Sequence, residues 1–322
     1  MKKLYINDCC YPEKLRNIPD PPPFIYVDGN LKLLNSNCIA IIGSRNCSEN
    51  GKKIAQKFSS ELSTVGITIV SGLAVGIDSV AHESSYNKPG KTIAVLGSGL
   101  NKIFPEDNKS LCQKILNNNG LIISEYSPDE EATSSNFLHR NRIISGLSLG
   151  LLIVEALPRS GTSNTAKHAR SQNKPIYTVP HEIWDSRGIG TNRLLKKDAK
   201  LITDTSEILK DLNLIRFRKK FLSLKSEGVF PNFTNKSAKN KTSASANYSN
   251  IKAVKFDDLK QAKVYEVLKS STAQQVCNFQ KNLSINELAS KSNLSVSEVL
   301  SVLFMLELNG YVKKVAGGYI CI

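Results

Sequence analysis

The sequence lacks the patterns that mark secreted, membrane-spanning or zinc-stabilised proteins. Its seven cysteines are an odd number without a C-x-x-C pair, which argues against a disulfide framework and against a zinc site. The longest apolar run, Leu147 to Leu157, is too short to span a bilayer and contains Glu155. Near the N-terminus, Asp8 stands where a signal peptide needs apolar residues. We therefore expect a cytoplasmic protein with reduced thiols and no membrane contact.

Histidine is also scarce, with four residues in the chain. His139, His168 and His181 show no metal-ligand spacing. His82 follows Asp78 by four residues, so the two would share one face of a helix. Such a pair can act as general acid and base, or it can fix a loop through hydrogen bonds. Because no serine or cysteine nucleophile stands beside the pair, we favour the structural role and expect no catalytic residue, cofactor or metal.

Positive charge is in excess, and its placement matters more than its size. The chain has 43 Lys and Arg against 28 Asp and Glu, a net charge of +15. Residues 211–260 alone hold eleven basic and four acidic residues. A polyanionic partner is plausible, but residues 232–250 are almost entirely Asn, Ser, Thr, Lys and Ala, which cannot bury enough apolar surface to order themselves. This composition predicts a flexible linker.

The fold expectation follows from alternation of apolar strands and amphipathic helices between Cys38 and about Leu212. Runs such as Thr92–Leu96 are continuously apolar, as in a parallel sheet covered on both faces. The sequence predicts an α/β fold, a doubly wound Rossmann-like parallel sheet with a C-terminal winged-helix-like domain after a flexible linker. Strands are expected at 38–43, 67–71, 92–97, 121–126, 150–156, 175–179 and 200–203, and a helix over Glu49–Leu62. The expected domains are an N-terminal extension packing on the core (1–37, irregular apart from a strand at 24–27), a Rossmann-like domain (38–212), a flexible basic linker (213–257) and a winged-helix-like domain (258–322).

The last sixty residues follow the winged-helix order. An amphipathic helix over 259–268, two capping-box patterns at 284–287 and 295–298, and a hairpin signal around 317–318 predict helix, helix-turn-helix and wing. The second helix of the pair, 296–309, contains no Lys or Arg and carries Glu298 and Glu307. A major-groove helix presents base-reading and phosphate-neutralising side chains. We therefore expect this domain to bind protein rather than to read DNA.

Several strands end in small, hydroxyl or cationic residues. Gly43-Ser44-Arg45 follows the first strand of the alternation, and Ser160-Gly161-Thr162 follows a later one. The carboxyl ends of parallel strands share one edge, where glycines, helix N-termini and arginines can hold phosphates. Because several such loops lie along one edge, a polyanion fits better than a small metabolite.

The stretch around Arg140-Asn141-Arg142 adds an aromatic, Phe137, to this edge. Arginines that bind phosphates, next to an aromatic ring on which a base can stack, are typical of proteins that bind single-stranded nucleic acid. The alternatives are that Phe137 is a core residue, and that the two arginines form structural ion pairs with Glu125 or Glu155. The candidate DNA-binding residues are Gly43, Ser44, Arg45, Ser71, Gly72, Gly76, Phe137, Arg140, Asn141, Arg142, Ser160, Gly161, Thr162, Asn164, Thr165 and Lys167.

Taken in order, these stretches resemble the DNA-processing protein A (DprA/Smf) family over roughly residues 11 to 210. The matching pieces are Gly43-Ser44-Arg45, Ser71–Ala74 with Gly76-Ile77-Asp78 and Ala81-His82, Thr92–Gly99 with Pro105, Ser124-Glu125-Tyr126, Arg140–Gly146, Val154-Glu155-Ala156, Ser160-Gly161-Thr162 with Thr165-Ala166, and Gly190-Thr191-Asn192. The resemblance implies a non-enzymatic, homodimeric protein that binds single-stranded DNA and helps load RecA recombinase onto strands taken up in natural transformation (competence).

Three departures from the family pattern accompany the resemblance. His181 and Asp198 stand where the family usually has glycine, and we expect the protein to lack the N-terminal helical domain of many relatives. A rival hypothesis is a nucleotide-processing enzyme of the Lonely-Guy phosphoribohydrolase type. That type places a catalytic glutamate shortly after its glycine loop, whereas here Ser163, Asn164 and Thr165 follow without an acid. A third, weaker hypothesis is a protein-interaction adaptor with a vestigial sheet edge.

Overall fold

The computed structural model describes residues 1–158, 160–230, 264, 267, 285–308, 312–315 and 318–321. The chain divides into two units, Met1–Lys236 and Ser237–Ile322, each of which is described by itself. Among the described residues, no helix is both long enough and apolar enough to cross a bilayer.

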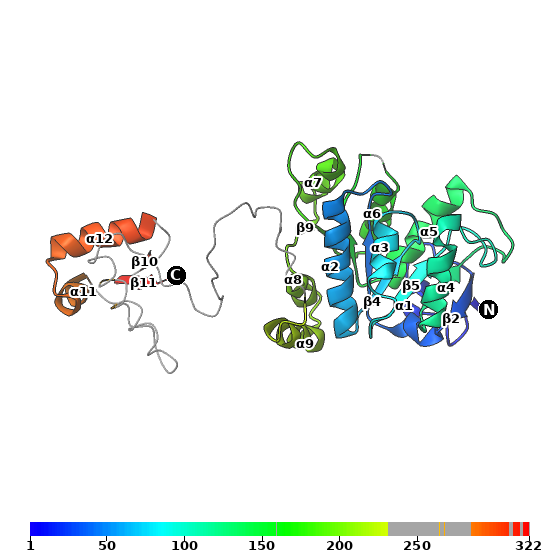
Figure 1. Cartoon of the computed structure of the whole chain (residues 1–322), viewed down its shortest axis with the longest axis horizontal. Coiled ribbons are helices and arrows are strands. Elements are labelled where there is room, and N and C mark those ends of the chain that lie inside the picture. The colour runs from blue at the N-terminus through cyan, green and yellow to red at the C-terminus, as the bar shows by residue number, and fades with distance from the viewer. Residues whose placement is uncertain are drawn as a thin grey trace, which may run out of the picture. The chain divides into compact units, whose positions relative to one another are not determined.

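The first unit is built on a nine-stranded sheet (Figure 1). Its strands are β1 (Lys2–Tyr5), β2 (Phe24–Gly29), β3 (Cys38–Ile42), β4 (Thr68–Ser71), β5 (Thr92–Val95), β6 (Leu121–Ser124), β7 (Gly150–Ile153), β8 (Ile176–Thr178) and β9 (Lys200–Leu201). The order across the sheet is β1-β2-β6-β5-β4-β3-β7-β8-β9. In this order, every neighbouring pair of strands between β6 and β9 is parallel. The strand β2 pairs with β6 in antiparallel orientation, and β1 pairs with β2 in the same way.

Helices cover both faces of this sheet because successive strand residues point to opposite sides. On one face, Ala40 of β3 packs in a core with the helices α1 (Glu13–Arg16), α5 (Ser134–Leu147) and α6 (Gly161–Ser171). On the other face, Ile39 and Ile41 of the same strand pack in a second core. The helices of that core are α2 (Glu49–Val65), α3 (Ile77–Glu83), α8 (Thr205–Asp211) and α9 (Ile215–Ser226). The helix α4 (Lys109–Asn117) packs on the strands β5 and β6. The remaining helix, α7 (Ile189–Leu195), precedes β9, and short 3-10 turns lie at Leu31–Asn35, Glu106–Asn108 and Ser186–Gly188. The predicted doubly wound parallel sheet is confirmed.

The N-terminal segment is more regular than the sequence indicated. The strand expected at 24–27 is present as β2, but β1 and α1 were not predicted. Both elements are only four residues long, and within them Leu4 and Leu15 are the buried apolar residues. An isolated buried residue gives no periodic signal, so neither element could be seen in the pattern.

The predicted flexible linker over 213–257 contains a helix near its start. Residues 215–226 form α9, with Phe221 fully buried in the core that contains α2. Little in the sequence indicated a buried side, because α9 is rich in basic residues. In the structure, its long charged side chains lie at the surface while Phe221 packs inward. The rest of the expected linker, residues 231–257, lies outside the described residues, and the four domain boundaries stay predictions.

The second unit shows the expected order of elements. The helix α11 (Ile285–Ser292) and α12 (Val296–Leu308) are joined by a turn in which Asn293 has a φ of 58°. A hairpin of β10 (Val312–Val315) and β11 (Gly318–Cys321) follows. Ser295 accepts from the Glu298 N–H and Glu298 accepts from the Ser295 N–H, so this capping box forms as predicted. Of the helix expected over 259–268, only Val264 and Val267 lie within the described residues, and both are helical.

Candidate nucleic-acid interface

A pocket of about 670 Å³ opens at the carboxyl ends of β3 and β7. The strand β3 neighbours β4 on one side and β7 on the other, so the chain winds away from this point in both directions. Such a reversal leaves a crevice in which open α/β sheets bind ligands. Of the sequence-predicted residues, the pocket brings together Gly43, Ser44, Arg45, Phe137, Arg140, Asn141, Ser160, Gly161, Thr162 and Thr165.

The loop after β3 owes its shape to two glycines. A Cβ on Gly43 would lie 2.6 Å from a side-chain carbon of Ile77, and a Cβ on Gly76 would lie 2.4 Å from the carbonyl oxygen of Ser44. Gly76 also has a φ of +86°, which side-chain-bearing residues rarely adopt. The start of α3 can therefore lie against this loop, and the Ile77 N–H donates to the Ser44 carbonyl over 3.2 Å. The loop leaves Arg45 exposed at the pocket.

Phe137 lies between two guanidinium groups. The Arg45 Cζ is 5.6 Å and the Arg140 Cζ is 5.8 Å from the centre of its ring. A second aromatic, Phe104, lies beside it with the ring centres 5.5 Å apart and is 47% exposed. The pocket thus presents the exposed Arg45 guanidinium next to a partly exposed aromatic pair, which suits a phosphate beside a stacked base.

Arg140 holds the strand ends together beneath Phe137. Its side chain is buried, and its Nη1 donates to the carbonyl of Gly72 over 2.8 Å and to that of Val95. Asp78 balances its charge and accepts from the Gly72 N–H over 3.1 Å. Burial lowers the pKa of Arg140 to about 10, so the group is cationic at neutral pH. Arg140 therefore supplies positive charge to the pocket, but its Nη1 is bonded to two backbone carbonyls and does not point freely at a ligand.

The Asp78 and His82 pair has the structural character that the sequence favoured. The His82 ring is fully buried and its Nδ1 lies 2.7 Å from the Thr92 hydroxyl. Burial, reinforced by the charge of Arg140, lowers the pKa of His82 to about 3. Burial raises the pKa of Asp78. Asp78 lies in the first turn of α3 and His82 in its last turn, and both bond to neighbouring strands and loops.

Arg142 does not line the pocket. Its guanidinium donates to both carboxylate oxygens of Glu125 at 2.7 Å, and its Nε donates to the Asp20 carboxylate at 2.8 Å. This fork ties α5 to the segment after β6 and to the N-terminal segment. Of the alternatives stated for Arg142, the geometry matches the structural ion pair with Glu125.

The N-terminus of α6 faces the pocket with open amides. No side chain caps it, and a Cβ on the exposed Gly161 would meet no atom within 4 Å. The Ser160 hydroxyl is buried without a hydrogen-bond partner among the described residues. Asn141 steadies the turn by donating to Asn164 over 3.2 Å and to the Gly161 carbonyl over 3.4 Å. A helix start with unfilled donors is suited to an anionic oxygen.

The other predicted site residues lie around the pocket rather than in it. Ser71 donates to the Ile41 carbonyl over 2.7 Å inside the sheet, and Gly72 packs against the Arg140 guanidinium. Asn164 lies behind the α6 turn, and Lys167 is exposed on the same helix. Their predicted contact with DNA stays a prediction.

Sequence reasoning missed several residues that line the pocket. The most notable are Phe104, Leu138 and Leu157, all more than 40% exposed, together with Asn46. Phe104 lies in the segment after β5, so the rule that strand ends gather at one edge would have included it. Its aromatic ring gave no signal there, because its direct neighbours, Ile103 and Pro105, are neither glycine nor arginine.

Comparison with known proteins identifies the family. The profile described as DNA recombination-mediator protein A matches residues 2–213, and the DprA winged helix domain matches residues 280–318. The chain is 40% identical over 204 residues to DNA processing protein DprA of Streptococcus pneumoniae, covering 63% of this chain and 72% of that protein. It is 34% identical over 310 residues to Protein Smf of Escherichia coli, covering 96% of this chain and 74% of that protein.

Solved structures agree with the sequence comparison. The crystal structure of DNA processing protein A from Streptococcus pneumoniae has a TM-score of 0.62 at 38% identity, covering 65% of this chain and 73% of that one. The protein from Helicobacter pylori, whose structure was described for its unique single-stranded DNA binding mode, has a TM-score of 0.59 at 33% identity, covering 66% of this chain and 96% of that one. The chain belongs to the DNA recombination-mediator protein A (DprA/Smf) family.

Proposed function

We propose that this protein binds single-stranded DNA across the pocket at the β3 and β7 ends. The observation that carries the proposal is the exposed Arg45 guanidinium over Phe137, with Phe104 on one side and the open start of α6 lining the same pocket. Phosphates would lie at Arg45 and at the Gly161 amide, and a base would stack on the aromatic pair. Arg140 would add positive potential from below.

The test is the salt dependence of binding to fluorescent oligo-dT. Each phosphate neutralised on a single strand adds about 0.7 to the slope of log affinity against log salt. We expect Arg45→Ala to weaken binding and to reduce this slope by about 0.7. Arg216→Ala, an exposed arginine on α9 outside the pocket lining, is the matched control and should leave the pocket contribution unchanged. A flat salt response, or tighter binding of duplex, would contradict the proposal.

We further propose that the bound strand is handed to RecA recombinase, and that the protein works as a cytoplasmic homodimer in DNA processing and natural transformation. Family membership supports this step. RecA filament formation on oligo-dT coated with single-strand binding protein should be accelerated by the wild-type chain and not by Arg45→Ala. Sedimentation equilibrium should give twice the monomer mass. Unchanged filament formation would remove the loading role while leaving DNA binding in place.

The rival nucleotide hydrolase finds little support in the pocket. Among the described residues that line it, Asp78 is the one carboxylate, and it is buried and bonded to the Gly72 N–H. A hydrolytic acid or base must reach its substrate. We therefore propose a binding protein without catalytic residues, and release of free base from nucleoside monophosphates would overturn this.

A further inference from the structure

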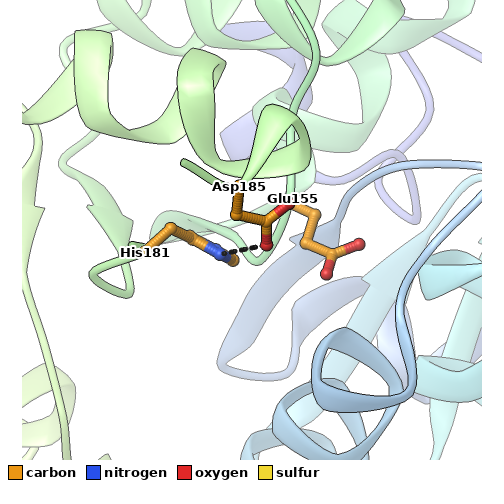
Figure 2. A group of neighbouring side chains, drawn as sticks. All are labelled: Glu155, His181 and Asp185. Atoms are coloured by element: carbon orange, nitrogen blue, oxygen red, sulfur yellow. Dashed lines mark ion pairs between the residues drawn. The ribbon is translucent and has the colours of Figure 1, made fainter. Parts of the chain in front are cut away.

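A second cluster of chemically active side chains lies outside the DNA pocket. Glu155, just beyond β7, meets His181 and Asp185 from the segment between β8 and α7 (Figure 2). One donor atom from each residue lies within 4.8 Å of the other two. Within the part of the chain that the structure describes, no other three His, Cys, Asp or Glu side chains converge in this way.

The His181 ring is oriented by the backbone. Its Nε2 lies 2.7 Å from the carbonyl oxygen of Val154, which can only accept, so Nε2 carries a hydrogen. With a hydrogen on Nε2, the lone pair of a neutral imidazole lies on Nδ1 and is directed toward Asp185, whose Oδ2 is 3.7 Å away, too far for a hydrogen bond. The His181 side chain is only 7% exposed. Two electron-rich atoms thus face each other at a nearly buried position, and a cation between them would satisfy both.

Both carboxylates are also held in place. The Oδ1 of Asp185 accepts from the Arg187 N–H over 2.9 Å, which leaves Oδ2 directed at His181. Glu155 is fully buried, and its two oxygens accept from the N–H and the hydroxyl of Ser48. Among the described residues, no lysine or arginine pairs with either carboxylate. Such outer hydrogen bonds orient the ligands of protein metal sites.

We propose that Glu155, His181 and Asp185 bind one zinc ion. One imidazole nitrogen and two carboxylate oxygens form a donor set that zinc accepts at about 2.0–2.2 Å. Asp185 is 30% exposed, so the fourth position faces solvent. The donors need to close in by about 1–2 Å from their present separations, which side-chain rotation can supply. The ion would clip the segment before α7 to the end of β7, in a role separate from the proposed DNA binding.

Sequence reasoning argued against a metal because it sought ligand spacing around each histidine. Glu155 and His181 are separated along the chain, and the adjacency of β7 and β8 brings them together. The proposal therefore rests on the fold rather than on a local motif.

The experiment is a titration of the chelator-treated full chain with zinc alone, followed by calorimetry and thermal unfolding. We expect one ion per chain and a rise in the melting temperature, because a ligand that binds only the folded state stabilises it. Asp185→Asn should weaken zinc binding at least tenfold while its amide oxygen still caps the Arg187 N–H. His181→Gln should weaken binding to a similar extent. Asp198→Asn, which changes an exposed carboxylate paired with Arg170, is the control and should bind zinc as the wild type does.

Three results would overturn the proposal. The first is that zinc produces no heat and no shift in the melting temperature of the wild-type chain. Binding that is equal in wild type, Asp185→Asn and His181→Gln would indicate an adventitious ion only, for example at the exposed Cys9 and Cys10. A loss of stability in Asp185→Asn under chelator, with no response of the wild type to zinc, would show that His181 and Asp185 form an ion pair alone.

Discussion

Arg45 and Arg142 show how little the residue type reveals about an arginine's role. Arg45 is exposed at the mouth of the pocket, whereas the Arg142 side chain is 4% exposed and its donors are filled by Glu125 and Asp20. The sequence predicted DNA contact for both, since each lies near a strand end or helix start. The difference arises from acids far away in the chain, which no local pattern reveals.

Arg142→Ala should therefore reduce stability rather than DNA affinity. It leaves the Glu125 carboxylate, 9% exposed, without its guanidinium partner. Removing one member of a buried ion pair costs about 3–5 kcal/mol. Arg170→Ala, which breaks the exposed pair with Asp198, should cost about 0–1 kcal/mol and serves as the control. Urea unfolding measures both, and equal losses in the two variants would contradict this account.

Phe104→Ala tests the aromatic pair directly. The ring is 47% exposed and contacts Phe137, so its removal should change stability little. If a base stacks on the pair, affinity for oligo-dT should fall by about 1–3 kcal/mol. Phe304→Ala removes an exposed phenylalanine on α12 and is the matched control. Equal oligo-dT affinity for both variants would remove Phe104 from the interface.

At the scale of elements, the start of α3 determines where the Arg45 loop lies. Gly76 permits this approach, because its backbone conformation and the nearby Ser44 carbonyl exclude a side chain. Gly161, at the start of α6, has open space around its Cβ position and an ordinary φ. The backbone at Gly76 thus requires glycine, whereas the position of Gly161 has room for a side chain, although both residues lie at the start of a helix beside the pocket.

Gly76→Ala should destabilise the protein by more than 1 kcal/mol and weaken oligo-dT binding by displacing the Arg45 loop. Gly161→Ala should leave stability equal or raise it by about 0.4–1 kcal/mol, since alanine restricts the unfolded chain. Denaturant unfolding and anisotropy titrations check the pair. A Gly76→Ala variant with unchanged stability and affinity would show that α3 can withdraw from the loop.

At the scale of the whole molecule, the buried His82 couples folding to pH. Its pKa is about 3 in the folded chain and about 6.5 when unfolded, so below pH 6.5 the unfolded chain binds the extra proton. This histidine's stabilisation is complete above pH 6.5 and is lost as pH falls toward 3, at up to about 1.4 kcal/mol per pH unit. Burial raises the pKa of Asp78, which acts in the opposite direction.

The free energy of unfolding should therefore fall more steeply with acidification in the wild type than in His82→Asn. Both chains retain Asp78 and the surface carboxylates, so the difference between their slopes isolates the histidine. Urea titrations between pH 7 and pH 4 measure it. Parallel pH profiles would mean that His82 is protonated in the folded chain.

Much of the molecule could be predicted from the sequence because its signals are local. The strands from β3 to β8 are apolar runs between helical patterns, and their alternation determines a doubly wound sheet. The gathering of Gly43, Arg45, Phe137 and Thr162 at one pocket follows from the same topology. What could not be predicted depends on distant partners, such as the burial of Arg140 by Gly72 and Val95 and the packing of Phe221 on the α2 side.

The margins of the nine-stranded sheet bear on how copies of this chain can associate. The outer strand β1 has four residues, including Lys2 and Lys3, and the opposite outer strand β9 has only Lys200 and Leu201. Short, lysine-bearing borders offer few unpaired amides to a neighbouring chain and repel a like-charged one. Extension of the sheet from one chain to the next is thus disfavoured at both outer strands.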